Sequence, residues 1–140
     1  MNEKIKILIA EDEKIIGIDI KKILIKFGYE VTSIVGTGID VIEKAELENP
    51  DLILMDIKLI GLLDGIEAAK IISFKHRTPI IFLTALNNKE TIQRIKGSGA
   101  FGFLLKPFNE QKLHEEIEKA LEIRRSELVT SEENHNKREE

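Results

Sequence analysis

Short apolar runs recur along the chain, and each is followed by a longer segment in which apolar residues have helical spacing. The runs predict five strands, at residues 5–10, 29–35, 51–56, 80–84 and 101–105. The third run, Leu52-Ile53-Leu54-Met55, shows no alternation with polar residues. Such continuity is typical of a strand that is buried on both faces, as in parallel sheets.

The segments after these runs predict five helices, which cover residues 16–27, 39–48, 66–74, 88–96 and a last stretch that begins near Asn109. Helix signals flank several of them. Gly28 suits a C-terminal cap, Thr37 with Asp40 resembles a helix start, and Asn109 can cap the last helix. Strands that alternate with helices predict an α/β fold, a doubly wound sheet of five parallel strands joined by right-handed crossovers.

The length of 140 residues suits a single domain, which we place at residues 1–125. Residues 126–140 are mostly polar and lack the apolar positions that a second core would need. Two interpretations remain open for this stretch: a solvated tail, or the start of a helical linker in which Leu128 and Val129 continue the last helix.

The amino-acid composition excludes several classes of function. Apolar residues make up 42% and charged residues 33% of the chain, and the net charge of −4 argues against non-specific binding to nucleic acid. The absence of cysteine excludes disulfides and thiolate zinc sites. His76, His114 and His135 have no metal-ligand spacing, and we expect all three to be exposed. No signal peptide or membrane span is recognised, so we expect a cytoplasmic protein that contacts neither membrane nor nucleic acid directly.

Polar side chains stand at the carboxyl ends of four predicted strands: Glu11 and Asp12, Asp56, Thr84 and Lys106. Any one of them alone is explained as a loop residue, since aspartates often begin loops. In a doubly wound sheet, however, these ends face the same crevice, where ligands bind. Three clustered carboxylates repel one another unless a cation lies among them. Oxygen-only ligands suit Mg²⁺ better than zinc.

A carboxylate nucleophile beside a divalent cation, a hydroxyl donor and a fixed ammonium group suits phosphoryl transfer. Asp56 would attack phosphorus, while Thr84, Lys106 and the metal neutralise charge on the phosphoryl oxygens. No GxxxxGK loop is present to cradle a nucleotide, so the phosphoryl group must come from another molecule.

The set Glu11-Asp12, Asp56, Thr84 and Lys106-Pro107 resembles the response-regulator receiver domain of two-component signalling, over residues 4–125. The resemblance implies a flavodoxin-like sheet with strand order 2-1-3-4-5. Two departures stand out. The acidic pair is Glu-Asp rather than Asp-Asp, and the loop at residues 57–65 lacks the usual proline and is one residue longer, similar to receivers joined to sensor or hybrid kinases.

The resemblance implies that Asp56 accepts the phosphoryl group and that Mg²⁺ is held by Glu11, Asp12, Asp56 and the backbone carbonyl of Lys58. The longer Glu11 can bind the metal through a water. Leu62 and Leu63, in the same loop, can face solvent as a docking patch or pack inward.

In the family, Thr84 and Lys106 would contact the phosphoryl group, and Thr84 and the aromatic at Phe103 would act as the switch. Their movement would reshape the face made by the fourth helix, fifth strand and fifth helix. A core role without rotation is the alternative for Phe103. The expected phosphoryl donor is a sensor histidine kinase or a phosphotransfer protein. A homodimer, and an output or kinase domain in the same chain, are further expected partners.

Two rival functions remain. An aspartyl phosphatase needs a second aspartate two residues after the nucleophile, and Lys58 stands there instead. A degenerate scaffold would keep the fold without phosphorylation, although all key positions are filled. We therefore expect a switched binding module that catalyses only its own phosphorylation and dephosphorylation, rather than an enzyme.

Overall fold

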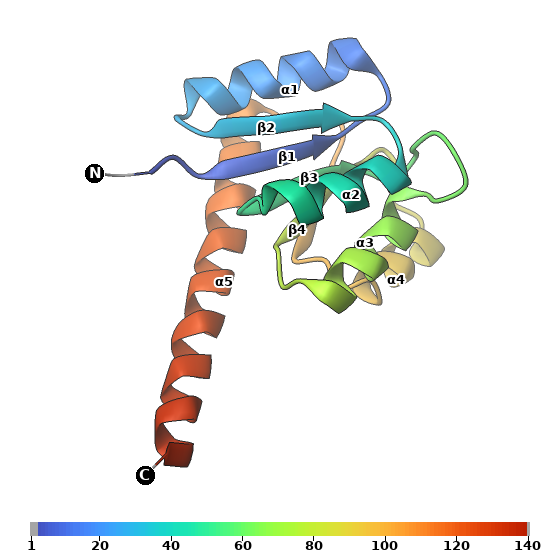
Figure 1. The fold of residues 1–140 in the computed structure, drawn as a ribbon. Helices are drawn as coiled ribbons and strands as arrows, with labels where there is room; N and C mark the ends of the chain where they lie inside the picture. Colours follow the sequence, from blue (N-terminus) through green and yellow to red (C-terminus); the bar gives the residue numbers. More distant parts are fainter. Residues whose placement is uncertain (1–2, 140) are drawn as a thin grey trace.

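In the computed structural model, the backbone is described for residues 3–139 and the side chains for residues 3–131. Strands and helices alternate strictly along the chain (Figure 1). The elements are β1 (Lys6–Ala10), α1 (Lys14–Lys26), β2 (Glu30–Val35), α2 (Gly38–Glu48), β3 (Leu52–Asp56), α3 (Gly65–Lys75), β4 (Ile80–Thr84), α4 (Lys89–Lys96), β5 (Gly102–Leu105) and α5 (Glu110–Glu139). The five predicted strands and five predicted helices are confirmed.

All strand pairs are parallel, and their order is β2-β1-β3-β4-β5. This is the flavodoxin-like order that the resemblance implied. Because β1 lies between β2 and β3, and the chain then moves outward in the other direction, the order reverses beside β1 and β3. Crevices at such a reversal, outside the carboxyl ends of the strands, are the usual ligand sites of open α/β sheets.

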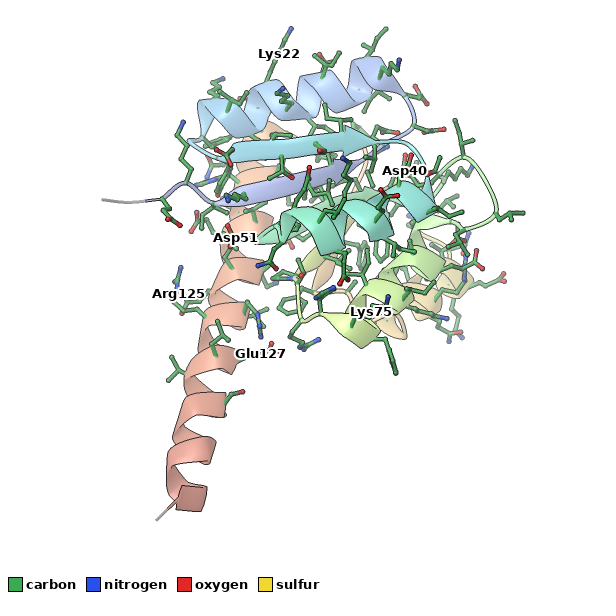
Figure 2. All side chains as sticks on the ribbon, viewed as in Figure 1. Lys22, Asp40, Asp51, Lys75, Arg125 and Glu127 are labelled. Carbon is green, nitrogen blue, oxygen red and sulfur yellow. The ribbon has the colours of Figure 1, made fainter. Side chains whose placement is uncertain are left out.

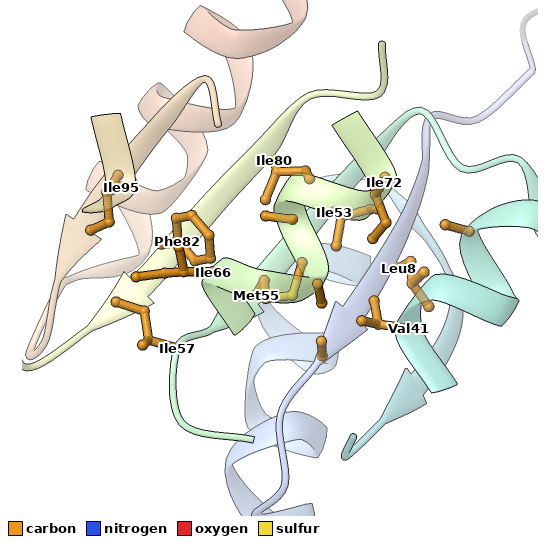
Figure 3. Close-up of a cluster of buried hydrophobic side chains, with 14 residues drawn as sticks. Leu8, Val41, Ile53, Met55, Ile57, Ile66, Ile72, Ile80, Phe82 and Ile95 are labelled. Carbon is orange, nitrogen blue, oxygen red and sulfur yellow. The ribbon is translucent and has the colours of Figure 1, made fainter. Parts of the chain in front are cut away.

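Each strand contributes alternate residues to two separate cores, which explains the unbroken apolar runs. On one face, Leu8, Ile53 and Phe82 pack with α2, α3 and α4 (Figure 3). On the other face, Ile7 and Leu54 pack with buried residues of α1 and α5. The sheet is therefore covered on both sides, and only its edges and ends remain free to bind ligands.

Local chemistry sets the helix ends as predicted. The Thr37 hydroxyl accepts a hydrogen bond from the backbone N–H of Asp40 at 3.0 Å, and the Asn109 side chain accepts one from the N–H of Lys112 at 2.7 Å. Gly28 follows α1 with φ of 91°, a conformation that favours glycine. These caps account for boundaries that lie within two residues of the predicted ones.

The last helix, α5, is much longer than the part of it that packs on the sheet, and its C-terminal part extends away from the domain (Figure 1). It runs through Leu128 and Val129, as the helical-linker alternative predicts, and both side chains are exposed. Glu127 lies on α5 (Figure 2). Arg77 pairs with it through two hydrogen bonds of 3.2 and 2.7 Å and so holds the helix against the domain. The domain boundary at residue 125 stays a prediction.

Among residues 3–139, no helix combines the length and the apolar character needed to cross a bilayer. The predicted exposure of the histidines is wrong for two of them. His76 is half-buried and pairs with Glu46 at 2.9 Å, and His114 is half-buried against Phe27. The side chain of His135 lies outside the described residues.

Candidate functional site

The acidic residues at the ends of β1 and β3 come together, as their position in the sheet predicts. One carboxylate oxygen from each of Glu11, Asp12 and Asp56 lies within 4.8 Å of the others. Glu11 is only 4% exposed, whereas Asp12 and Asp56 are half-buried. Among the described residues this is the one group of three acidic or histidine ligands that could hold a metal ion.

Lys106 directly follows β5, which lies next to β4, and its side chain reaches this acidic group. Its Nζ lies 3.3 Å from Asp56 Oδ2 and 3.5 Å from Glu11 Oε1. The backbone holds the residue in place, since the Lys106 N–H donates to the carbonyl of Thr84 at 2.8 Å. The peptide that follows, to Pro107, is cis. The ammonium group therefore contacts two of the three carboxylates.

Thr84 ends β4 and is 2% exposed. Its hydroxyl oxygen accepts a hydrogen bond from the backbone N–H of Leu86 at 2.9 Å. A hydroxyl that accepts one bond still has its own proton to donate. This buried residue can therefore offer a hydrogen-bond donor to an anion beside Asp56.

The electrostatics of the site favour a bound cation. Burial, and then the nearby Asp56 carboxylate, raise the pKa of Glu11 to about 7. Burial by itself would lower the pKa of Lys106, but the carboxylates of Asp56 and Glu11 outweigh it and raise that pKa. The ammonium group thus stays charged, and one ammonium is set against three carboxylates.

The polar groups line a cavity of about 260 Å³ at the carboxyl ends of the strands. Asp12, Asp56, Thr84 and Lys106 all contribute to its wall, and Leu86 adds an apolar side. The donor set consists only of oxygen atoms and carries excess negative charge, which fits a hard divalent cation such as Mg²⁺.

The loop after β3 holds Asp56 by its backbone. The N–H of Lys58 donates to Asp56 Oδ1 at 3.3 Å, a contact expected of an ordinary loop aspartate, while Asp56 Oδ2 faces Lys106. The N–H of Gly65 closes the loop by donating to the carbonyl of Ile57 at 2.7 Å. A Cβ on Gly65 would lie 2.1 Å from the carbonyl oxygen of Asp56, so only glycine fits there.

Gly65 is a positioning residue, whereas from the sequence it is only the last residue of the loop at residues 57–65. The dipeptide Asp64-Gly65 gave the signal, because Asp64 caps α3 with a capping box while the next residue packs on the strand end. Arg94 of α4 also pairs with Asp64 at 2.7 Å. No local sequence pattern announces that ion pair.

Phe103 lies on β5, next to β4, and is half-buried against the core on the α3–α4 side. It faces Phe82 in the register of the two strands, two residues before Thr84. The predicted switch pair therefore occupies adjacent strands. Leu62 is 91% exposed, whereas Leu63 is half-buried and lies against Gly38, so the exposed alternative applies to Leu62.

Comparison with known proteins agrees with this geometry. Residues 7–118 match the family model described as the response regulator receiver domain. The transcriptional regulatory protein PdtaR of Mycobacterium tuberculosis is 40% identical over 116 residues, which cover 83% of this chain and 56% of that protein. The chain thus spans little more than half the length of this relative.

The chemotaxis protein CheY of Bacillus subtilis is 34% identical over 117 residues, which cover 83% of this chain and 97% of that protein. Among solved structures, the N-terminal domain of a response regulator/sensory box/GGDEF 3-domain protein from Carboxydothermus hydrogenoformans is 38% identical. Its TM-score is 0.79, with 88% of this chain and 98% of that one covered.

Proposed function

We propose a phosphorylation switch for this chain, which belongs to the response-regulator receiver family of two-component signalling. In this proposal Asp56 accepts a phosphoryl group from a phosphohistidine on a sensor histidine kinase or a phosphotransfer protein. The observation that carries it is the contact of Lys106 with Asp56 and Glu11, inside a group of three carboxylates. A cluster with only a structural role would be charge-neutral, and a third carboxylate would not be needed.

The chain's own residues have separate tasks in this reaction. A carboxylate oxygen of Asp56 forms a bond to phosphorus while the P–N bond of the phosphohistidine breaks, and the imidazole nitrogen keeps the electron pair. Lys106 balances charge on the transferred group, and the Thr84 hydroxyl donates a hydrogen bond to one of its oxygens.

Glu11, Asp12, Asp56 and the backbone carbonyl of Lys58 would hold the Mg²⁺ ion, which supplies charge neutralisation at the phosphoryl oxygens when bound. Because the pKa of Glu11 is raised to about 7 in the metal-free site, Glu11 is partly protonated near neutral pH and would lose that proton when the ion binds. The acidic group fits the ion without any nitrogen or sulfur ligand.

After transfer, the hydroxyl of Thr84 follows the phosphoryl group, and Phe103 on the adjacent strand adjusts to the space that it leaves. The face formed by α4, β5 and α5 then changes shape for a partner, a second copy or an output domain. Support comes from Thr84, which lines the cavity, and from Phe103, which packs on the core from the adjacent strand β5 of that face.

An aspartyl phosphatase is the second class considered. Its general acid would have to stand at Lys58, whose exposed ammonium group cannot take that role beside a nucleophilic aspartate. We therefore assign the chemistry of this site to self-phosphorylation and self-dephosphorylation only.

The test is incubation with acetyl phosphate and Mg²⁺, followed by intact mass measurement. We expect the mass of one added phosphoryl group in wild type. The group should not be added when Mg²⁺ is chelated beforehand, nor in Asp56→Asn. Asp51→Asn is the matched control, because Asp51 directly precedes the same strand at its opposite end. Modification of Asp56→Asn to the same extent as wild type would refute the assignment.

A further inference from the structure

The turn between β2 and α2, formed by Gly36, Thr37 and Gly38, touches both loops that carry the acidic site, although it contributes no side chain to the cavity. We call these three residues the glycine turn. Sequence reasoning used only Thr37, as a helix cap, and left the two glycines without a role. Their surroundings suggest one.

On one side, the glycine turn lies against the loop that follows β1. A Cβ on Gly36 would lie 3.3 Å from Asp12 Cα and 3.8 Å from the carbonyl oxygen of Glu11. Just before the turn, the carbonyl of Val35 accepts a hydrogen bond of 2.8 Å from the N–H of Glu11. The backbone of both acidic residues therefore rests on this turn.

On the other side, the glycine turn holds the loop that follows β3. The N–H of Ile60 donates to the carbonyl of Gly36 at 3.1 Å, and Ile60 forms an isolated parallel bridge with Thr37. A Cβ on Gly38 would lie 2.8 Å from both Cβ and the carbonyl oxygen of Leu63. Only glycine at position 38 leaves room for this close approach.

Side-chain burial alone does not hold the outer part of that loop. Ile60 is 60% exposed and Leu62 is 91% exposed, and Gly61 between them has φ of 103°. Lys58 lies between two anchors, the buried Ile57 and the tethered Ile60. Release of the second anchor would free the backbone on the C-terminal side of Lys58.

We propose that Gly38 is a positioning residue for metal binding: by admitting Leu63, it fixes the β3–α3 loop and, with it, the backbone of Lys58 relative to the acidic pair. This inference rests on the proposed function, because it assumes that Mg²⁺ binds among Glu11, Asp12 and Asp56. Groups that orient metal ligands without touching the metal commonly change metal affinity by about tenfold or more.

The test is the affinity of the whole chain for Mg²⁺, measured by titration calorimetry without any phosphodonor. We expect Gly38→Ala to bind Mg²⁺ about tenfold more weakly than wild type. The amide of Ile60 should also exchange faster in Gly38→Ala, because its partner moves. Gly97→Ala is the matched control: it also adds one methyl group, its φ is −85°, and its nearest neighbour would be 3.7 Å away.

Ala120→Gly distinguishes a role in metal binding from a general loss of stability. This substitution lies in the buried part of α5, far from the loop, and should destabilise the fold. Its Mg²⁺ affinity should equal that of wild type at temperatures where it is folded. Equal weakening in Ala120→Gly and Gly38→Ala would overturn the positioning role. If Gly38→Ala does not fold, Ile60→Pro takes its place, because it removes the N–H that donates to the carbonyl of Gly36; Ile60→Ala, which keeps that N–H, is its control.

The two proposals fail in different ways. If the wild-type chain binds no Mg²⁺, the proposed function itself is refuted. If wild type binds Mg²⁺ with the same affinity as Gly38→Ala, or as Ile60→Pro where that variant is needed, the proposed function stands and the role of the glycine turn is refuted.

Discussion

Two polar clusters lie at different parts of this molecule: one joins its members by hydrogen bonds, and the other gathers three carboxylates around one ammonium group. Between β2 and α5, the Tyr29 hydroxyl donates to Glu118 Oε1 at 3.0 Å and lies 3.1 Å from His114 Nδ1. Phe27 stacks on the ring of His114 with centroids 4.3 Å apart. Because the single hydroxyl proton goes to Glu118, the second contact places a proton on His114 Nδ1.

The cluster at the carboxyl ends of the strands has the opposite character. Three carboxylates share one ammonium group, and the most buried of the acids, Glu11, has a pKa of about 7. At Tyr29, by contrast, burial and the bond to Glu118 raise the pKa and keep the hydroxyl protonated. The cluster around Tyr29 therefore joins two elements, whereas the cluster at the strand ends has the charged groups that suit a cation and an anion.

The largest effect should follow from removing the one cation of the site. Lys106→Met leaves the carboxylates without their ammonium partner, and loss of a single charge-stabilising donor typically costs about a hundredfold in rate. We expect phosphorylation by acetyl phosphate to slow by about that factor, measured by intact mass over time. Lys119→Met, an exposed change on α5, should leave the rate unaltered. A Lys106→Met rate equal to that of wild type would contradict the site.

Mg²⁺ should stabilise the wild-type chain, because it binds the folded state and relieves repulsion among the acids. At a concentration about a hundred times its dissociation constant, the gain in unfolding free energy is about 2.7 kcal/mol. Urea unfolding with Mg²⁺ and with EDTA measures it. Asp12→Asn should lose most of this gain, whereas Tyr29→Phe should keep it; equal gains in both variants would break the distinction between the clusters.

The raised pKa of Glu11 predicts a pH dependence of the metal-free protein. The folded state holds the Glu11 proton up to about pH 7, and the unfolded state releases it near the ordinary value of 4.5. The contribution of Glu11 to stability is therefore fully present below pH 4.5 and is lost as the pH rises to about 7.

Glu11→Gln stays neutral and should lack this loss. Urea unfolding in EDTA at about pH 5 and about pH 8 should show wild type losing stability relative to Glu11→Gln. Titrating groups that are remote from Glu11 are common to both chains and cancel in the difference. A gap that does not change with pH would rule out the raised pKa.

The smallest effect is expected at the cluster around Tyr29. Tyr29→Phe removes one hydroxyl and its two hydrogen bonds while keeping the buried ring, which should cost about 1 kcal/mol of unfolding free energy. Phosphorylation by acetyl phosphate and Mg²⁺ affinity should be unchanged. Chemical denaturation and the mass assay together check this, and a phosphorylation defect would show that the two clusters are linked.

Much of the site was predictable because it depends on topology. Parallel strands place their carboxyl ends at one edge, so Asp56, Thr84 and Lys106 had to converge once the strands were recognised. The order of the strands was not predictable from the apolar pattern, since the pattern is the same on every buried strand. It came from the family resemblance, and the pairing of β1 with both β2 and β3 confirms it.

The contacts of His114 show the other limit. Tyr29 and His114 are 85 residues apart in the chain, and nothing near either residue announces their hydrogen bond, so the expectation of an exposed histidine was wrong. The same holds for Gly38 and Leu63, which meet only because two separate loops pack against each other.

By itself, the amino-acid sequence determined the alternation of strands and helices, the caps at Thr37 and Asn109, and the candidate chemistry of the acidic site. These features depend on local periodicity and on residue type. Only the tertiary structure decided the pKa of Glu11, the oxygen atoms that Lys106 contacts and the close approach at Gly38. Those features depend on burial and on distances of a few ångströms between segments that are remote in the chain, which no local pattern encodes.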